Sequence, residues 1–284
     1  MAELAAELET RDLAEKAPHR IHAPKFRAWS GLWPKVVAVL IAVGVWQMAA
    51  WSGWRPADVL PAPLPVFQTL FGDLSHADFY AGLAMTLRRA VLAYGIAVVI
   101  GTLVGLLVAR STILRTAVGS AILGLQSMPS IAWFPLALLL FQRSEAAIFT
   151  VVLLGAAPSI ASGLLSGVDH VEPLLIRVGR VMGARGFGLY RHVILPAALP
   201  SFAGGLKQGW AFAWRSLMAG ELIVAVGSQP SLGQQLRAAQ NLADTSQLVA
   251  LMIVIFIIGI AVDALFGALD REIRRRWGLL GTEA

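Results

Sequence analysis

The stretch RVGRVMGARGFGLYRHVILPAALP, residues 177–200, is basic and rich in glycine, yet long apolar runs flank it on both sides. It holds five Arg and His side chains, four glycines and two prolines. A segment this polar does not belong inside the apolar interior that the flanking runs would form. The composition of the rest of the chain therefore decides how the stretch is interpreted.

That composition is typical of a membrane protein. Of the 284 residues, 57% are hydrophobic and 14% are charged, and the mean hydropathy is +0.70. Soluble domains are about a quarter charged. The chain has no cysteine, which excludes disulfides, thiol catalysis and Cys-based metal sites, and its five histidines are scattered. We therefore interpret the excess of Lys and Arg as a marker of cytoplasmic loops rather than of nucleic-acid binding.

Six apolar runs are each long enough to cross a bilayer, which takes about 20 residues. They cover about residues 34–53, 84–109, 116–141, 146–166, 200–226 and 247–269. Pro129, Pro135 and Pro158 lie inside these runs and predict kinked or broken helices. The fold class that follows is an all-α membrane protein with six transmembrane helices.

The distribution of Lys and Arg predicts the orientation of these spans. With the N-terminus inside, the outside loops hold only Arg55, Arg143 and Arg237, with Arg88 and Arg89 near the outer end of the second span. The other Lys and Arg outside the spans lie on the inner side. The chain is thus predicted to be a multi-pass protein of the plasma (inner) membrane with both termini in the cytoplasm. The quoted stretch then faces the cytoplasm.

In the quoted stretch and the six residues before it, the pattern predicts a helix, a turn and a second helix. An apolar-periodic segment runs from Val171 to Met182, GARGFG forms the turn, LYRHVIL is a second amphipathic piece, and Pro196 begins the next element. Gly183 provides the turn, where a side chain would clash or would not tolerate a positive φ. An ordinary basic loop is the alternative. It needs neither amphipathic flanks nor a fixed interval between Gly183 and VILP.

The same stretch resembles the cytoplasmic loop motif of ABC importer permeases: Glu-Ala-Ala, three residues, Gly, nine residues, Ile-x-Leu-Pro. The motif glycine corresponds to Gly183 and the final Leu-Pro to Leu195 and Pro196. Arg177, Val178 and Gly179 stand where the family has Glu-Ala-Ala, so a base replaces the acid.

Four further segments resemble one branch of these permeases, which imports nitrate, aliphatic sulfonates and taurine. They are MTLRRAVLAYGIAVVIGTLVGLLVARS, LGLQSMPSIAWFPLALLLF, AWRSLMAGELI and SLGQQLRAAQNL. The resemblance covers about residues 35–277. It implies the type I ABC importer permease fold, with a cytoplasmic coupling helix.

The resemblance also implies a division of the chain into regions. Residues 1–30 form a cytoplasmic tail, and residues 31–80 the first transmembrane helix with an external loop. Residues 81–270 form a core of five transmembrane helices with a coupling loop at 167–199, and residues 271–284 a second cytoplasmic tail.

The partners implied by the resemblance are a second copy of this chain, two copies of an ATP-binding subunit, an extracytoplasmic substrate-binding protein and the lipid bilayer. The chain has no GxxxxGK[ST] phosphate loop. It is therefore expected to be a permease rather than an enzyme, with no cofactor of its own, while the partner ATPase uses ATP and Mg.

Two sets of residues carry the expected function. The coupling set, which would contact the ATPase, is Gly183, Ala184, Arg185, Gly186, Phe187, Leu189, Tyr190 and Arg191. In it Gly183 forms the turn, Ala184, Phe187, Leu189 and Tyr190 form a packing surface, and Arg185 and Arg191 make polar contacts.

The second set would line the translocation pathway. It is Gln126, Ser127, Met128, Ser130 and Trp133 around Pro129, with Trp214, Arg215, Ser216 and Glu221 in the fifth span. A helix broken at Pro129 could expose backbone amides to an anion. Charges inside a membrane are costly and face a cavity or each other. Arg215 and Glu221 are thus either part of the pathway or members of structural ion pairs.

Other functions are less compatible with the sequence. The same permease role for another small metabolite, such as a thiamine-precursor pyrimidine, is the nearest alternative. An ATP-independent secondary transporter is a more distant alternative, because it would not need the helix–turn–helix around Gly183. A membrane-embedded enzyme would need paired His, Asp or Glu side chains inside the spans, and no pair at helical spacing is found there.

Overall fold

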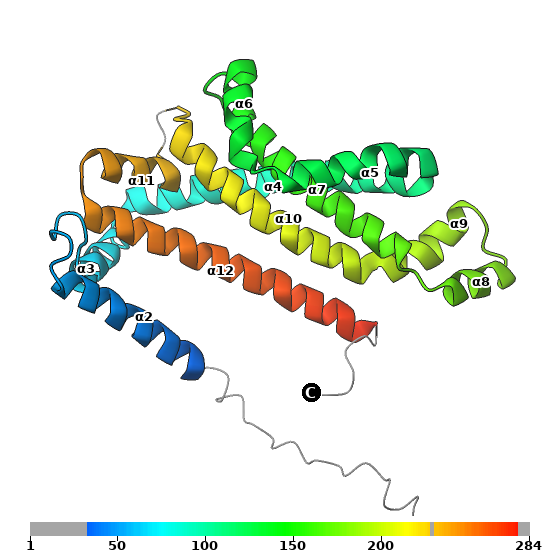
Figure 1. Ribbon diagram of the computed structural model, residues 1–284, viewed down its shortest axis with the longest axis horizontal. Helices are drawn as coiled ribbons and strands as arrows, with labels where there is room; N and C mark the ends of the chain where they lie inside the picture. Colours follow the sequence, from blue (N-terminus) through cyan, green and yellow to red (C-terminus); the bar gives the residue numbers. More distant parts are fainter. Residues whose placement is uncertain (1–32, 228–229, 278–284) are drawn as a thin grey trace, which may run out of the picture. The chain divides into compact units, whose positions relative to one another are not determined.

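A computed structural model describes residues 33–227 and 230–277 of the chain (Figure 1). Every regular element in these ranges is helical. The elements are α2 (Trp33–Trp51), α3 (Pro63–Asp73), α4 (Ala77–Arg110), α5 (Thr112–Ser127), the 3-10 helix η2 (Ser130–Trp133), α6 (Phe134–Phe141), α7 (Glu145–Asp169), α8 (Pro173–Val181), α9 (Phe187–Leu189), the π-helix η3 (Tyr190–Ile194), α10 (Leu195–Ile223), α11 (Leu232–Asn241) and α12 (Thr245–Arg276). The predicted all-α class is confirmed. The predicted tail at residues 1–30 lies outside the described residues, as do residues 278–284 of the C-terminal tail.

The chain forms two compact units, Met1–Ser52 and Gly53–Ala284. In the first unit the described part is α2, a helix of 19 residues with no buried side chain. Its length and apolar composition allow it to cross a membrane. All other described elements belong to the second unit.

Length and composition identify four described helices that could cross a membrane: α2, α4, α7 and α12. A fifth crossing or a re-entrant loop is formed by the stretch from Ile113 to Phe141, which bends by 101° between Ser127 and Ser130. The break falls at Pro129, as the prolines predicted. The remaining predicted span, α10, has 29 residues but is less apolar, because it contains Lys207, Gln208 and internal Pro200.

Helices α7 and α10 form the centre of the second unit and approach each other through small residues. A Cβ atom built on Gly163 would lie 2.5 Å from the Cα atom of Gly205, and one on Gly167 would lie 2.6 Å from the carbonyl oxygen of Ala198. At both places the two backbones touch. Inside a membrane the hydrophobic effect does not drive helices together, so such close contacts are a main source of helix association.

The other helices pack around this pair. Helix α4 lies against α7 through Gly101 and Gly105, and a Cβ atom on Gly101 would be 2.7 Å from the carbonyl oxygen of Ala157. Helix α12 packs against α10, α11 and α3. Where α5 meets α7, the amide nitrogen of Gln126 donates to the carbonyl of Pro158 at 2.8 Å. The broken span is thus fixed to α7 next to its internal proline.

Two neighbouring glycines of α10 provide a test of the backbone contact. Gly205→Ala should lower stability by about 1–3 kcal/mol, because its methyl group would collide with Gly163. Gly204→Ala is the matched control, since no atom lies within 4 Å of its Cβ position. Alanine favours a helix over glycine by about 1 kcal/mol, so the control should be neutral or stabilising. Thermal unfolding in mild detergent measures both; equal stability of the two variants would contradict the contact.

Candidate functional site

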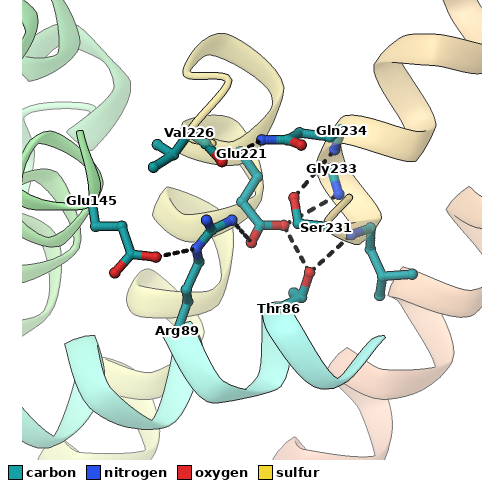
Figure 2. Close-up of polar contacts among 9 residues, drawn as sticks. Thr86, Arg89, Glu145, Glu221, Val226, Ser231, Gly233 and Gln234 are labelled. Carbon is teal, nitrogen blue, oxygen red and sulfur yellow. Dashed lines mark hydrogen bonds and ion pairs between the residues drawn. The ribbon is translucent and has the colours of Figure 1, made fainter. Parts of the chain in front are cut away.

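A buried ion pair connects α4 to α10. The guanidinium Nη1 of Arg89 lies 3.2 Å from Oε1 of Glu221, and these side chains are 3% and 0% exposed (Figure 2). The Nε of Arg89 also donates to Glu145 at the start of α7, again at 3.2 Å, and the Glu145 side chain is 47% exposed. One arginine of α4 therefore joins the start of α7 to the end of α10.

The second carboxylate oxygen of Glu221 binds the start of α11. The Thr86 hydroxyl donates to Oε2 of Glu221 at 2.8 Å and accepts the backbone N–H of Leu232 at 3.0 Å. The backbone N–H of Gly233 donates to the same Oε2 at 3.2 Å (Figure 2). A side chain at Gly233 would collide with Glu221. We call Thr86, Arg89, Glu145, Glu221 and Gly233 the Arg89 network.

The Arg89 network bears on one question that the sequence left open. Glu221 is a member of an ion pair between helices, but its partner is Arg89 and not Arg215. Sequence reasoning missed Thr86, Glu145 and Gly233, and noted Arg89 only as a basic residue near the outer end of its span. The available signal was that a buried carboxylate needs a cationic partner, and that Thr86 and Arg89 share a helix face at a spacing of three residues.

Most of the predicted pathway residues around Pro129 meet in one cleft of about 390 Å³, which we call the polar cleft. Its lining residues are Leu125, Gln126, Ser127, Met128, Pro129, Ser130, Ile131, Gly155, Phe212, Arg215 and Ala219. Ser216 lies beside this cleft, and its hydroxyl donates to the hydroxyl of Ser130 at 2.7 Å. Trp133, Trp214 and Glu221 are not among the lining residues.

A second hollow of about 540 Å³ lies along α10 and α12. We call it the apolar groove; its lining residues are Trp210, Ala211, Trp214, Arg215, Met218, Leu236, Met252, Ile255, Phe256, Gly259, Ile260 and Asp263. Only Arg215 appears in the lining of both hollows. Its side chain is exposed, its Nε donates to the carbonyl of Ala211 at 3.0 Å, and its guanidinium lies 4.9 Å from the ring centre of Phe212.

The predicted helix–turn–helix is present: α8 is followed by a turn and then by α9, which continues through η3 into α10. We call residues 173–194 the coupling segment. Gly183 has φ +89° and Gly186 has φ +52°, and no atom lies within 4 Å of either Cβ position. Of the two reasons considered for Gly183, the structure therefore supports a positive φ and not a lack of space. Gly179 is tightly packed, since a Cβ atom there would lie 2.8 Å from Val193.

The coupling segment has its own small core and is attached to the end of α4. Leu189 packs with Val171 and Ile194, so it faces inward. The hydroxyl of Tyr190 donates to the carbonyl of Ala109 at 3.3 Å, and the guanidinium of Arg110 lies over the rings of Tyr190 and Phe187 at 5.9 and 5.8 Å. Leu189 and Tyr190 thus hold the segment in place.

The outer surface of the coupling segment is apolar and basic. Val181, Met182 and Phe187 are 88%, 82% and 64% exposed. From the predicted coupling set, Gly183, Arg185, Gly186 and Arg191 are exposed as well, and Ala184 is half-buried. Val181 and Met182 were interpreted from the sequence only as part of the apolar periodicity, although they are the most exposed apolar side chains of the segment.

Comparison with known proteins places these features in a family. Residues 97–275 match the family model described as binding-protein-dependent transport system inner membrane component. The putative aliphatic sulfonates transport permease protein SsuC of Bacillus subtilis is 27% identical over 236 residues, which cover 83% of this chain and 84% of that protein. The taurine transport system permease protein TauC of Escherichia coli is 28% identical, covering 85% of this chain and 91% of its own.

A nitrate import permease, NrtB of Leptolyngbya laminosa, is 26% identical and covers 82% of this chain and 85% of its own. Among solved structures, an inward-facing MetNI methionine ABC transporter superposes with a TM-score of 0.59. It is 20% identical and covers 69% of this chain and 96% of its own chain. This likeness shows that the fold is that of the type I importer permeases, as predicted.

The Arg89 network can be tested by removing its two acids separately. Glu221→Ala should lower stability by about 3–5 kcal/mol, because it leaves a buried guanidinium and the start of α11 without their partner. Glu145→Ala is the control on the same arginine and should cost about 1 kcal/mol or less, because its carboxylate is half-exposed. Thermal unfolding of both purified variants decides; a similar loss in both would show that Glu221 is not the main partner.

Proposed function

We propose that this chain is a permease that carries a small anionic solute and is coupled to its ATPase subunit through residues 173–194. The chain belongs to the family of binding-protein-dependent transport system inner membrane components. Members of this family are permease subunits of ABC importers and not enzymes, since a separate subunit hydrolyses ATP. The family also implies an ATP-binding subunit and a substrate-binding protein as partners.

The observation that carries the coupling role is the construction of the coupling segment. Its outer surface exposes Val181, Met182 and Phe187 on a turn held open by two glycines of positive φ. Tyr190 fixes the inner side of the segment to α4, and its second helix continues without a break through η3 into α10. A force from a docked ATPase subunit would reach the α7–α10 pair directly. Such rigid-body transmission suits alternating access.

The proposed orientation and assembly follow from the same end of the molecule. Arg110, Arg115 and the arginines of the coupling segment gather there, since Arg115 pairs with Asp169 at 2.6 Å and Arg110 contacts Phe187. By the positive-inside rule we propose that this end is the cytoplasmic one and that both termini are cytoplasmic, as the sequence predicts. The complex contains two copies of this chain and two ATP-binding subunits.

The proposed solute is an anion of the sulfonate, taurine or nitrate type. Its support is that three relatives, each similar over more than four-fifths of this chain, are named as permeases for aliphatic sulfonates, nitrate and taurine. The exposed guanidinium of Arg215 beside the polar cleft agrees with an anionic solute.

Affinity purification of the tagged chain in mild detergent tests the permease role. We expect an ATP-binding cassette subunit to be recovered in equal amount, since the coupling segment would bind it. A chain that is purified alone and transports in liposomes without ATP would be a secondary carrier, contrary to the proposal.

Two substitutions of Gly183 distinguish whether the coupling segment needs the positive φ of this residue or the absence of a side chain. Gly183→Val should abolish substrate-stimulated ATP hydrolysis while membrane insertion stays intact, because a β-branched residue disfavours φ +89°. Gly183→Asn adds a side chain of similar size but adopts positive φ more readily, so it should retain most of that activity. ATPase assays on the reconstituted complex measure both. Unchanged activity in Gly183→Val would contradict the coupling role.

A further inference from the structure

Arg215 is a charge in an apolar part of the molecule. It lies about two turns before the end of α10, and it lines the apolar groove together with residues from Met252 to Ile260 in the first half of α12. The 18-residue window of highest hydropathy in α12 has a mean of 2.9, the most apolar of the spanning helices. A guanidinium at this depth is costly unless a cavity or a ligand receives it.

Arg215 has no acidic partner in the part of the chain that the structure describes. Within the described residues, no carboxylate oxygen lies within ion-pair distance of its guanidinium. By contrast, Arg89 is paired with Glu221, and Lys207 of α10 with Asp263 of α12 at 3.2 Å. Among the described residues, Arg89 and Lys207 thus have acidic partners, whereas Arg215 contacts the carbonyl of Ala211 and the ring of Phe212.

The two hollows that share Arg215 have different chemistry. The polar cleft offers the side chains of Gln126, Ser127 and Ser130, whereas the apolar groove is lined mainly by Trp, Met, Ile and Phe. The acidic residue in the lining of the groove, Asp263, is already engaged by Lys207. The groove therefore suits an uncharged aliphatic chain better than a chain that ends in an ammonium group.

We propose that Arg215 binds the head group of an aliphatic sulfonate, with the sulfonate toward the polar cleft and the hydrocarbon chain in the apolar groove. The inference deepens the proposed function and rests on it, because it selects one substrate class among the anions of the relatives. The planar guanidinium has five N–H donors and matches the oxygens of a sulfonate. Nitrate has no chain and would leave the groove unused.

The head-group contact is tested by uptake of radiolabelled methanesulfonate and hexanesulfonate into host cells whose only copy of this permease is the variant. Arg215→Gln should reduce uptake of both by roughly tenfold to a hundredfold, since hydrogen bonds to charged groups contribute about 1.5–3 kcal/mol. Arg215→Lys keeps the charge and should retain more. Arg143→Gln removes another exposed arginine, outside both hollows, and should have no effect.

The chain contact is tested on two adjacent exposed residues of α12. Phe256 lines the apolar groove and is 67% exposed, whereas Ile257 is 55% exposed and does not line it. Phe256→Ala should raise the KM for hexanesulfonate about tenfold and leave that for methanesulfonate unchanged. Ile257→Ala should change neither. A loss of both substrates in equal measure, or the same effect from Ile257→Ala, would overturn the placement of the chain.

Failures of the two proposals are distinguishable. Wild-type uptake of sulfonates that persists unchanged in Arg215→Gln overturns the site and leaves the permease role intact. If the wild type takes up nitrate but neither sulfonate, the aliphatic-sulfonate assignment is wrong. Membrane content and co-purification of the ATP-binding subunit accompany each variant, and a transport loss counts for the site only where both match the wild type.

Discussion

The direct backbone contact between α7 and α10 is the constraint on which the rest of the structure depends. Gly163 and Gly205 leave no room for a side chain, and Gly167 and Gly209 bring the backbone similarly close to their neighbours. In a bilayer, lipid tails solvate apolar side chains as well as a neighbouring helix does, so close packing has to supply the attraction. The two helices therefore have to move as one body wherever either is displaced.

Both ends of this helix pair are fastened, but by different means. At one end α7 and α10 are joined through the coupling segment, whose small core and contact with Ala109 are partly apolar and reach the surface. At the other end Glu145 of α7 and Glu221 of α10 share Arg89, and Glu221 also holds the start of α11. The pair thus lies between an exposed apolar and basic surface at one end and a buried polar junction with α4 and α11 at the other.

Sequence patterns predicted what depends on local chemistry. Apolar runs gave the spanning helices, Pro129 marked the break in the third span, and amphipathic flanks around Gly183 predicted the coupling segment. Which charged side chains pair with each other could not be predicted in the same way. Glu221 meets Arg89, 132 residues away in sequence, because α4 and α10 pack together, and no local pattern encodes that contact. Leu189 likewise faces inward, because α8 folds back over it.

Arg89 and Arg215 are two charges in one bundle that differ in burial and in their partners. Both lie in apolar surroundings, but Arg89 lies between two carboxylates, whereas Arg215 lies beside two hollows and, among the described residues, contacts a carbonyl and an aromatic ring. A charge that serves stability gains from being neutralised inside the protein, because removing its partner is then costly. A charge that must bind and release a passing anion cannot be neutralised permanently, since an internal carboxylate would compete with every solute. Its stabilisation inside the protein has to come from weak contacts, such as those of Arg215 with the carbonyl of Ala211 and the ring of Phe212.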